Sequence, residues 1–429
     1  MRSIAVILCL LTLALSSYAQ DDDWEEWGDD EWSEVEEGGL QWNGFFELAL
    51  GSRWDRDPQV ERKQTLGDMR FRLETDWSSE KLSVGFKGDA WYDSYLEEFD
   101  GELRDLSLSF SPSSNLDMKL GRQVLTWGTG DLLFLNDLFP KDWVSFFAGR
   151  DDEYLKAPSN AVRATWYGEI VNVDLAWTPV FESDEYLTGE RFSFFSPLAG
   201  QRIAPSPPLS GIEPDKDIDN GEVAVRLFKT FGGTEMAMYA YHGFFHQPTA
   251  FTDTFQPTFA PLTSIGASVR RPLGVGLFNA EAVYYASRDD RSGSDPYLPN
   301  DQARLLLGYE REAITNFTVA FQYYLEWTQD YSELLANSLA PVFEPDEYRH
   351  VVTGRLNYRL NQDKLTLSLF TFYSPSDNDF YLRPSVTYRY SDQWSVTGGA
   401  SIFGGDDAHT FFNQFADNSN AYIRVRYNY

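Results

Sequence analysis

Residues 40–50, LQWNGFFELAL, decide the fold because their apolar and polar side chains alternate. Leu48 and Leu50 fall on one face of such a segment, whereas Asn43 and Glu47 fall on the other. Apolar residues at every second position are typical of a β-strand that is apolar on one face and polar on the other. The stretch therefore predicts a two-faced strand.

The same alternation recurs up to the last residue and predicts about 18 strands in all. Short turns such as Gly232-Gly233 alternate with long connections such as 128–158 and 180–218. This asymmetry is typical of an outer-membrane barrel with tight periplasmic turns and longer extracellular loops. We therefore expect an all-β fold, a single transmembrane antiparallel up-and-down β-barrel over residues 39–429.

The polar faces of these strands carry more charged side chains than a dry interior tolerates. Burying a charge without water or a partner is costly, so a soluble β-sandwich is excluded. Aromatic residues also gather near the strand ends, as in the interfacial belts of membrane barrels. They are Trp54, Trp77, Trp91, Tyr92, Trp127, Trp166, Trp177, Trp327, Trp394 and Tyr429.

Composition narrows the class of protein further. The 429 residues include 35 Lys+Arg and 66 Asp+Glu, which gives a formal net charge of -31. A nucleic-acid-binding surface needs a basic face to displace counterions, so no nucleic-acid partner is expected. The only cysteine, Cys9, lies in the N-terminal apolar stretch, so we expect no disulfide and no cysteine chemistry in the mature chain.

The N-terminal region divides into two segments. Residues 1–19 have the features of a secretory signal peptide, with Arg2 before an apolar stretch and a small-x-small cleavage site at 17–19. Residues 20–38 form an acidic tail that contains tryptophan and is expected in the periplasm. Within 21–37 there are 11 acids and no base, so self-repulsion opposes independent folding.

Three interpretations of this tail stay open. It is a disordered spacer, a docking peptide for a periplasmic protein, or a plug whose carboxylates enter the barrel from below. Trp24, Trp27 and Trp32 fall within one broad sector of a helical wheel. The tail could therefore present these three indoles together to a partner.

Arginine is the most informative residue type on the polar faces. A wall of forked, always charged guanidinium groups attracts carboxylate or phosphate groups, so we predict an arginine-lined lumen. The candidate lumen residues are Arg70, Arg72, Arg226, Arg304, Arg355, Arg359, Arg383, Arg389, Arg424 and Arg426.

An alternative interpretation pairs these arginines with inward acids in a structural network across the wall. Such pairing would leave no net selectivity for anions. The candidate acids are Glu47, Asp68, Glu74, Asp76, Asp117, Glu222, Glu281 and Glu310.

The connection at 128–158 is unusually apolar. An exposed loop of this composition would favour aggregation, so we expect it to fold into the barrel mouth as a constriction. Its acidic group Asp151-Asp152-Glu153 is expected to be solvated loop charge. The alternative for this group is Ca²⁺ binding or bridging to lipopolysaccharide phosphates.

A motif of moderate specificity covers the start of this connection and the strand before it. Its residues are Gly121, Arg122, Gln123, Trp127, Gly128, Asp137, Pro140, Asp142, Leu155, Lys156 and Pro158. The motif resembles the signature of alginate-export-type barrels and of a related family of large Gram-negative outer-membrane barrels. The resemblance implies a channel with an arginine-lined path for an anionic polymer and an inward loop. Simple alternation points Arg122 toward lipid, so we expect a bulge that turns it inward.

Enzyme function is not expected. Catalysis would need a histidine beside a nucleophile or an acid, and the chain has only 4 histidines. His242 and His246 lie at the upper end of a strand and are expected to be polar rim residues. No metal ion and no cofactor are predicted.

The pattern thus predicts a porin-like outer-membrane channel that passes a polar or anionic solute, with polysaccharide as one candidate. The alternative is a non-conducting barrel that serves as a docking or structural component of a periplasm-spanning lipid or efflux assembly. We expect integral insertion in the outer membrane of a Gram-negative bacterium, in contact with lipid and lipopolysaccharide. The barrel assembly machinery is a further expected partner, because the C-terminal Tyr427-Asn428-Tyr429 resembles the aromatic-ended last strand of such barrels.

Overall fold

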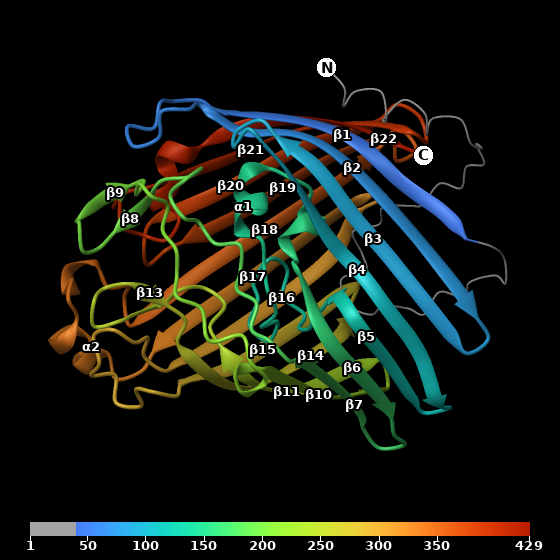
Figure 1. The fold of residues 1–429 in the computed structure, drawn as a ribbon, viewed down its shortest axis with the longest axis horizontal. Helices are drawn as coiled ribbons and strands as arrows, with labels where there is room; N and C mark the ends of the chain where they lie inside the picture. The colour runs from blue at the N-terminus through green and yellow to red at the C-terminus, as the bar shows by residue number, and fades with distance from the viewer. Residues whose placement is uncertain (1–39) are drawn as a thin grey trace.

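The first strand, β1 (Gln41–Arg53), pairs on one side with β2 (Gln64–Ser79) and on the other with the last strand, β22 (Asn420–Asn428). This double pairing closes an 18-stranded antiparallel sheet into a barrel (Figure 1). The computed structural model describes residues 40–429. Within them the predicted fold class is confirmed.

The other barrel strands follow one another in chain order. They are β3 (Leu82–Asp93), β4 (Glu98–Ser113), β5 (Leu116–Val124), β6 (Pro158–Tyr167), β7 (Asn172–Thr178), β10 (Glu222–Phe231), β11 (Thr234–Phe244), β14 (Pro261–Leu273), β15 (Gly276–Ser287), β16 (Gln302–Ile314), β17 (Phe317–Thr328), β18 (Tyr348–Leu360), β19 (Leu365–Ser374), β20 (Asp379–Arg389) and β21 (Trp394–Gly405). Loops hold the short pairs β8 (Phe194–Ser196) with β9 (Gln201–Ile203) and β12 (Ala250–Phe251) with β13 (Pro257–Thr258), and the helices α1 (Trp143–Ala148) and α2 (Tyr331–Asn337). In the part of the chain from residue 40 onward, no helix has the length and apolar character needed to cross a membrane.

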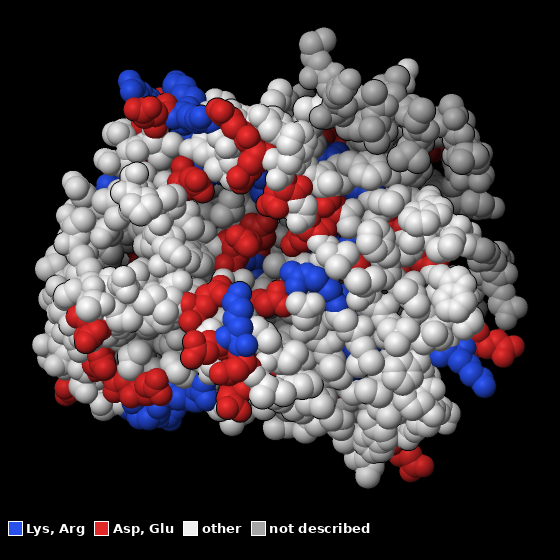
Figure 2. Space-filling model, viewed as in Figure 1, with Lys and Arg blue, Asp and Glu red and all other residues white. Residues whose placement is uncertain are grey.

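The alternation of the strands places apolar side chains outside and polar ones inside. On β1, Leu48 is 55% exposed, whereas its neighbour Glu47 is only 4% exposed. This is the reverse of a soluble protein, and it suits a barrel whose outer surface meets lipid. In Figure 2 the charged side chains of the visible face gather mainly in its central part, whereas the lower right part shows mostly uncharged side chains.

Most of the predicted aromatic belt lies on this outer surface. Exposed members are Trp54, Trp77, Trp166, Trp327, Trp394 and Tyr429. Two predictions were wrong. Trp91 lies under the guanidinium of Arg70, whose Cζ is 4.2 Å from its ring centroid. Trp127 is buried because the chain has already turned into the barrel at that point.

The two ends of the barrel differ. One end has tight hairpin turns, such as Gly232-Gly233 with φ values of 55° and 75°, a conformation that glycine adopts without strain. The other end carries the long loops together with β8, β9 and α2 (Figure 1). These loops pack against one another: Arg202 Nη1 lies 3.0 Å from Asp417 Oδ2, and the rings of Phe195 and Phe343 are 5.0 Å apart.

Candidate functional site in the barrel lumen

Residues 125–157, the inward segment, connect β5 to β6 through the interior of the barrel. Its apolar side chains, including Leu135, Phe147 and Leu155, are buried and belong to one hydrophobic cluster with the inner faces of distant strands. The wall residues of that cluster include Tyr239 on β11, Tyr285 on β15, Tyr324 on β17, Tyr381 on β20 and Phe403 on β21. The segment therefore crosses the lumen.

Helix α1 gives the inward segment its rigid centre. The Asp142 carboxylate caps the helix by accepting a hydrogen bond from Ser145 N at 2.7 Å, and Gly149 ends it with a φ of 86°. The helix directs Phe147 toward the rings of Tyr381 and Phe403, with centroid distances of 5.6 and 5.4 Å. Through these aromatic contacts α1 packs against β20 and β21.

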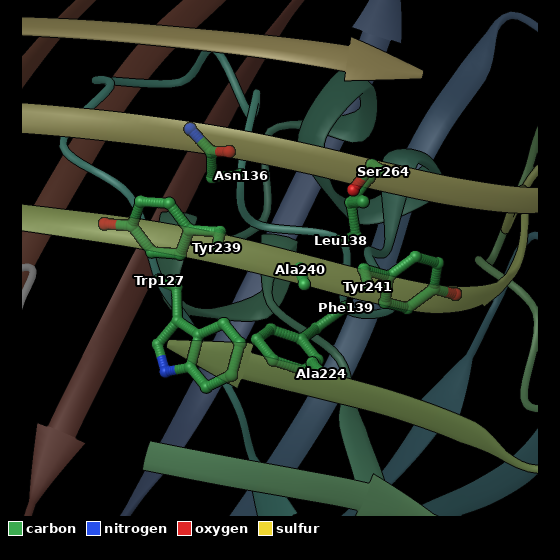
Figure 3. A pocket seen from close by; sticks show the side chains of 9 residues that line it. All are labelled: Trp127, Asn136, Leu138, Phe139, Ala224, Tyr239, Ala240, Tyr241 and Ser264. Carbon is green, nitrogen blue, oxygen red and sulfur yellow. The ribbon is translucent and has the colours of Figure 1, made fainter. Parts of the chain in front are cut away.

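The opposite flank of the segment packs on β10, β11 and β14 (Figure 3). The rings of Trp127 and Phe139 lie 5.1 Å apart, and Trp127 faces Tyr239 at 6.2 Å. Trp127 Nε1 donates a hydrogen bond of 3.2 Å to Asp174 on β7. The remaining cavity measures about 10 Å³, about the minimum for one water molecule. This flank is closely packed.

The acidic triplet, Asp151, Asp152 and Glu153, lies inside the barrel among wall cations. Arg424 Nη1 and Arg426 Nη2 on β22 donate to Asp151 Oδ2 at 2.8 and 2.9 Å. The expectation of solvated loop charge is therefore wrong. The inward course of the segment carries these acids to the wall.

The other two triplet carboxylates contact other strands. Asp152 pairs with Arg383 on β20, with Nη1 3.3 Å from Oδ2. Glu153 accepts a hydrogen bond of 2.6 Å from Arg72 Nη1 on β2 and lies 3.4 Å from Lys87 Nζ on β3. The triplet thus spans both sides of the seam between β1 and β22.

Charge pairing lowers the pKa of two triplet carboxylates, those of Asp151 and Glu153. Burial by itself raises the pKa of Glu153, but the neighbouring Arg72, Lys87 and Arg104 outweigh it and lower that pKa to about 2. The pKa of Asp151 is also held below its usual range, because Arg424 and Arg426 outweigh the effect of burial. These carboxylates stay anionic at neutral pH.

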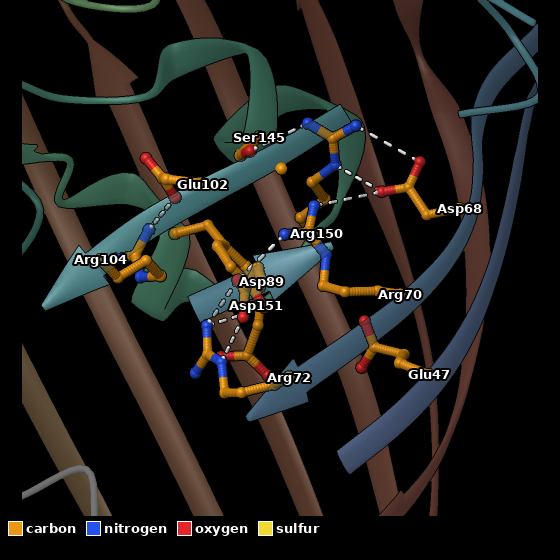
Figure 4. A network of polar contacts seen from close by, with 12 residues as sticks. Glu47, Asp68, Arg70, Arg72, Asp89, Glu102, Arg104, Ser145, Arg150 and Asp151 are labelled. Atoms are coloured by element: carbon orange, nitrogen blue, oxygen red, sulfur yellow. Dashed lines mark hydrogen bonds and ion pairs between the residues drawn. The ribbon is translucent and has the colours of Figure 1, made fainter. Parts of the chain in front are cut away.

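A β-bulge on β4 adds one further cation to this site. In the β3–β4 register Lys87 pairs with Asp105 and Gly88 with Leu103, so Arg104 is an extra residue. Its Nη2 donates to the carbonyl oxygens of Glu153 and Lys156 at 3.1 and 2.8 Å. The bulge therefore points Arg104 toward the backbone of the inward segment (Figure 4).

Further contacts tie the segment to the far wall. Asp131 Oδ2 lies 2.6 Å from Arg355 Nε on β18. Asn136 Nδ2 donates a hydrogen bond of 2.8 Å to Glu281 on β15, and Thr129 N donates to the same carboxylate. The segment is thus anchored on opposite sides of the barrel.

The remaining candidate arginines lie outside the triplet site. Arg70 Nη1 lies 3.1 Å from Asp89 Oδ2, and Arg226 Nη2 lies 2.5 Å from Glu235 Oε1. Arg304 Nη2 is 3.3 Å from Glu326 Oε2, and Arg359 Nε is 3.9 Å from Asp363 Oδ1. Arg389 ends β20 near the tight turns. The structure brings together only Arg72, Arg383, Arg424 and Arg426 of the predicted set around the triplet.

Several of the acids predicted for a wall network do pair with cations. Glu47 contacts Arg424 and Arg426, Asp68 contacts Arg70 and Arg150, Glu310 contacts Arg355, and Glu74 contacts Lys87. Glu281 instead accepts from the inward segment. Sequence reasoning missed the triplet as the main counter-charge, although three consecutive acids in an apolar connection were a visible signal.

The Gly121-Arg122-Gln123 motif shapes the exit from β5. Gly121 has a φ of 118°, and a Cβ there would lie 2.2 Å from the carbonyl oxygen of Leu106. Gln123 is buried and donates to the Ala161 carbonyl at 3.2 Å. Arg122 pairs in register with exposed Asn160 and lies 2.8 Å from Glu182 Oε2, so it stays on the face opposite to Gln123. The predicted inward turn of Arg122 is wrong, and the bulge lies at Arg104 instead.

The other motif residues support the inward segment. Asp137 Oδ1 pairs with Lys141 Nζ at 3.0 Å, both buried, and a Cβ at Gly128 would lie 3.1 Å from Glu281 Oε1. Pro140 is buried beside them, and Pro158 starts β6. Asp142 caps α1, as described above.

The two rim histidines have different surroundings. His242 lies on the outer face, 3.0 Å from Thr263 Oγ1 and 2.7 Å from Arg288 Nη1. His246 is buried, with Nε2 3.4 Å from Glu222 Oε1. Burial lowers the pKa of His246, but Glu222 and Asp184 outweigh it and raise that pKa to about 9. Residues 40–429 contain no group of His, Cys, Asp and Glu that would hold a metal ion.

The predicted tail residues Trp24, Trp27 and Trp32 lie outside the described residues. Their docking or plugging role stays a prediction.

Known structures share the barrel fold. The chain is similar to OccAB1 of Acinetobacter baumannii, with 10% identity and a TM-score of 0.52 over 91% of this chain and 95% of that one. It is also similar to OccK11 of Pseudomonas aeruginosa, with the same four values. A third similar structure is Pseudomonas aeruginosa OccK2 in complex with glucuronate, with 11% identity and a TM-score of 0.52 over 91% and 97%. At these identities the likeness is one of fold.

No protein-family model and no curated protein matches the sequence. The resemblance of residues 121–158 to alginate-export-type barrels therefore stays a prediction.

Proposed function

We propose that this chain is an outer-membrane channel for polar or anionic solutes, in which the inward segment forms the constriction. The main support for this proposal is that the two halves of the lumen differ in polarity. Toward the loops, the inward segment fills the interior with apolar packing. Toward the tight turns, inward positions carry hydroxyl and charged groups, such as Thr387, Thr397 and Arg359, which suit a water-filled bore.

The nature of the solute follows from the wall. Guanidinium groups bind carboxylates in a forked geometry, and the wall already holds the carboxylates of the acidic triplet in this way. The similar barrel OccK2 was solved with glucuronate, a sugar carboxylate. We therefore place sugar acids, and with them an anionic polysaccharide, first among the candidate solutes.

Planar-bilayer recordings test this function. The purified protein should form pores, and a salt gradient should give a measurable reversal potential. Exchanging four wall arginines for glutamine should move that potential toward cation preference, because the wall loses four positive charges and three of them face the acidic triplet. The variant is R383Q/R389Q/R424Q/R426Q, and its control with the same charge change at exposed positions is R56Q/R62Q/R271Q/R311Q. Equal potentials in both variants would refute a selective role of the wall.

A second function has one observation in its favour. The inward segment is anchored to opposite walls, by Arg355 on β18 and by Arg72 on β2, as in a barrel that stays closed. Such a barrel would serve as a docking or structural component of a periplasm-spanning lipid or efflux assembly. Absence of pores in the intact chain and in a chain lacking residues 21–37 would favour this second function.

A further inference from the structure

The acidic triplet is bound as a ligand would be. Its carboxylates come from a connection between strands, whereas the cations that hold them come from the wall. These contacts are charge-assisted hydrogen bonds, such as Arg72 Nη1 to Glu153 at 2.6 Å and Arg424 Nη1 to Asp151 at 2.8 Å. A solute with several carboxylates offers the same acceptor groups.

The triplet side chains are partly exposed, whereas the two residues that follow them in the chain are buried. The side chains of Asp151, Asp152 and Glu153 are 24%, 16% and 36% exposed. Tyr154 and Leu155 are only 2% and 0% exposed, and they anchor the backbone. A solute in the lumen can therefore reach the wall cations when carboxylate side chains rotate away, without removal of the inward segment.

We propose that the acidic triplet is a built-in competing ligand of an anion-binding site on the barrel wall. The site consists of Arg72, Lys87, Arg383, Arg424 and Arg426, and its external ligand is a solute that bears several carboxylates, such as a short polyuronate. The inference rests on the proposed function as a channel for anionic solutes. It adds that the triplet carboxylates, which already occupy the site, weaken the binding of the external solute.

Equilibrium binding to the full-length protein in micelles tests this competition. The probes are trigalacturonate, which has three carboxylates, and maltotriose, which is uncharged. In D151N/D152N/E153Q the competing charges are gone while side-chain size is nearly kept, so trigalacturonate should bind about tenfold more tightly or better, and maltotriose should be unaffected. Equal affinity of trigalacturonate for this variant and the wild type would overturn the proposal.

Two controls separate local competition from net charge. The variant E61Q/D253N/D346N removes three charges from exposed positions, and it should bind trigalacturonate like the wild type. An equal gain in this control would show a general charge effect and overturn the proposal. Adding R383Q/R424Q/R426Q to the triplet variant should abolish the gain, and a persistent gain would place the ligand elsewhere and also overturn it.

Folding is checked by the heat-dependent migration of the barrel in electrophoresis. If the triple variant does not fold, the single variants D152N and E153Q replace it, each with a smaller expected gain, and no gain in either overturns the proposal. Failure of the proposed channel function would give a different result from failure of the proposed competition. In that case bilayers show no pores in any variant, while the difference in trigalacturonate affinity in micelles persists.

Discussion

The guanidinium of Arg150 lies 2.6 Å from the carboxylate of Asp68, measured from Nε to Oδ2, and both residues are buried inside the barrel (Figure 4). Asp68 belongs to β2, whereas Arg150 follows Gly149, the residue that ends α1. Arg150 Nη2 also lies 3.3 Å from Asp93 Oδ2, and Nη1 donates to Ser145 Oγ at 3.1 Å. This side chain therefore joins the wall to α1 through Ser145.

Loss of this pair should destabilise the barrel. Asp68→Asn leaves a buried guanidinium short of one counter-charge, and breaking a buried ion pair costs about 3–5 kcal/mol. Urea unfolding in micelles should show a loss near the lower end of that range, because Asp93 remains. The control Glu97→Gln affects an exposed pair with Arg62 and should cost less than about 1 kcal/mol. Equal losses in the two variants would argue against a structural role of the buried pair.

Loss of the Phe147 ring, which packs α1 against the wall, should destabilise the barrel to a similar extent. Phe147 is buried between Tyr381, Phe403 and Phe415, and Phe147→Ala should destabilise the barrel by about 3–5 kcal/mol through the lost contacts and the cavity left behind. Phe255→Ala, at a half-exposed ring, serves as the control in the same unfolding assay. A small effect at Phe147 would mean that α1 packs loosely in the lumen.

Low pH should lower the stability of the barrel through protonation of Glu153. The folded pKa of Glu153 is about 2, below its ordinary value of 4.5. A lowered pKa contributes stability above the ordinary value, and this stability is lost as pH falls from about 4.5 toward 2. Tryptophan fluorescence during urea unfolding should show this decline in the wild type and a weaker one in Glu153→Gln. Parallel pH profiles for the two proteins would contradict the ion pairing of Glu153.

High pH should lower the stability of the barrel through loss of the charge on His246. The folded pKa of His246 is about 9, above its ordinary value of 6.5, because Glu222 and Asp184 outweigh burial. A raised pKa gives stability that is fully present below 6.5 and is lost as pH rises through 9. Unfolding between pH 6 and pH 10 should therefore show a decline that His246→Gln lacks. His242→Gln, on the outer face, is the matched control and should keep the wild-type profile.

The strands were predictable because their signal is local. Alternation along β1 or β22 reports directly which side chains face lipid and which face the lumen, so each strand can be identified from its own residues. The acidic triplet was not predictable in the same way. Asp152 and its partner Arg383 are 231 positions apart, and only the path of the inward segment brings them together.

The errors at single residues have local physical reasons. Arg122 was expected to point inward because of a bulge. Instead, Gly121 adopts a positive φ, and the alternation of side chains along β5 continues without a bulge. The extra residue is Arg104 on the neighbouring strand. Trp127 was assigned to the belt because it was expected near the end of a strand, yet β5 ends at Val124 and the chain enters the lumen before Trp127.

The position of the triplet has a consequence for assembly. Asp151 holds the last strand through Arg424 and Arg426, while Glu153 holds the second strand through Arg72. A nascent barrel that has not yet joined its first and last strands cannot offer both sets of partners at once. The acidic triplet therefore obtains its full set of counter-charges only in the closed barrel.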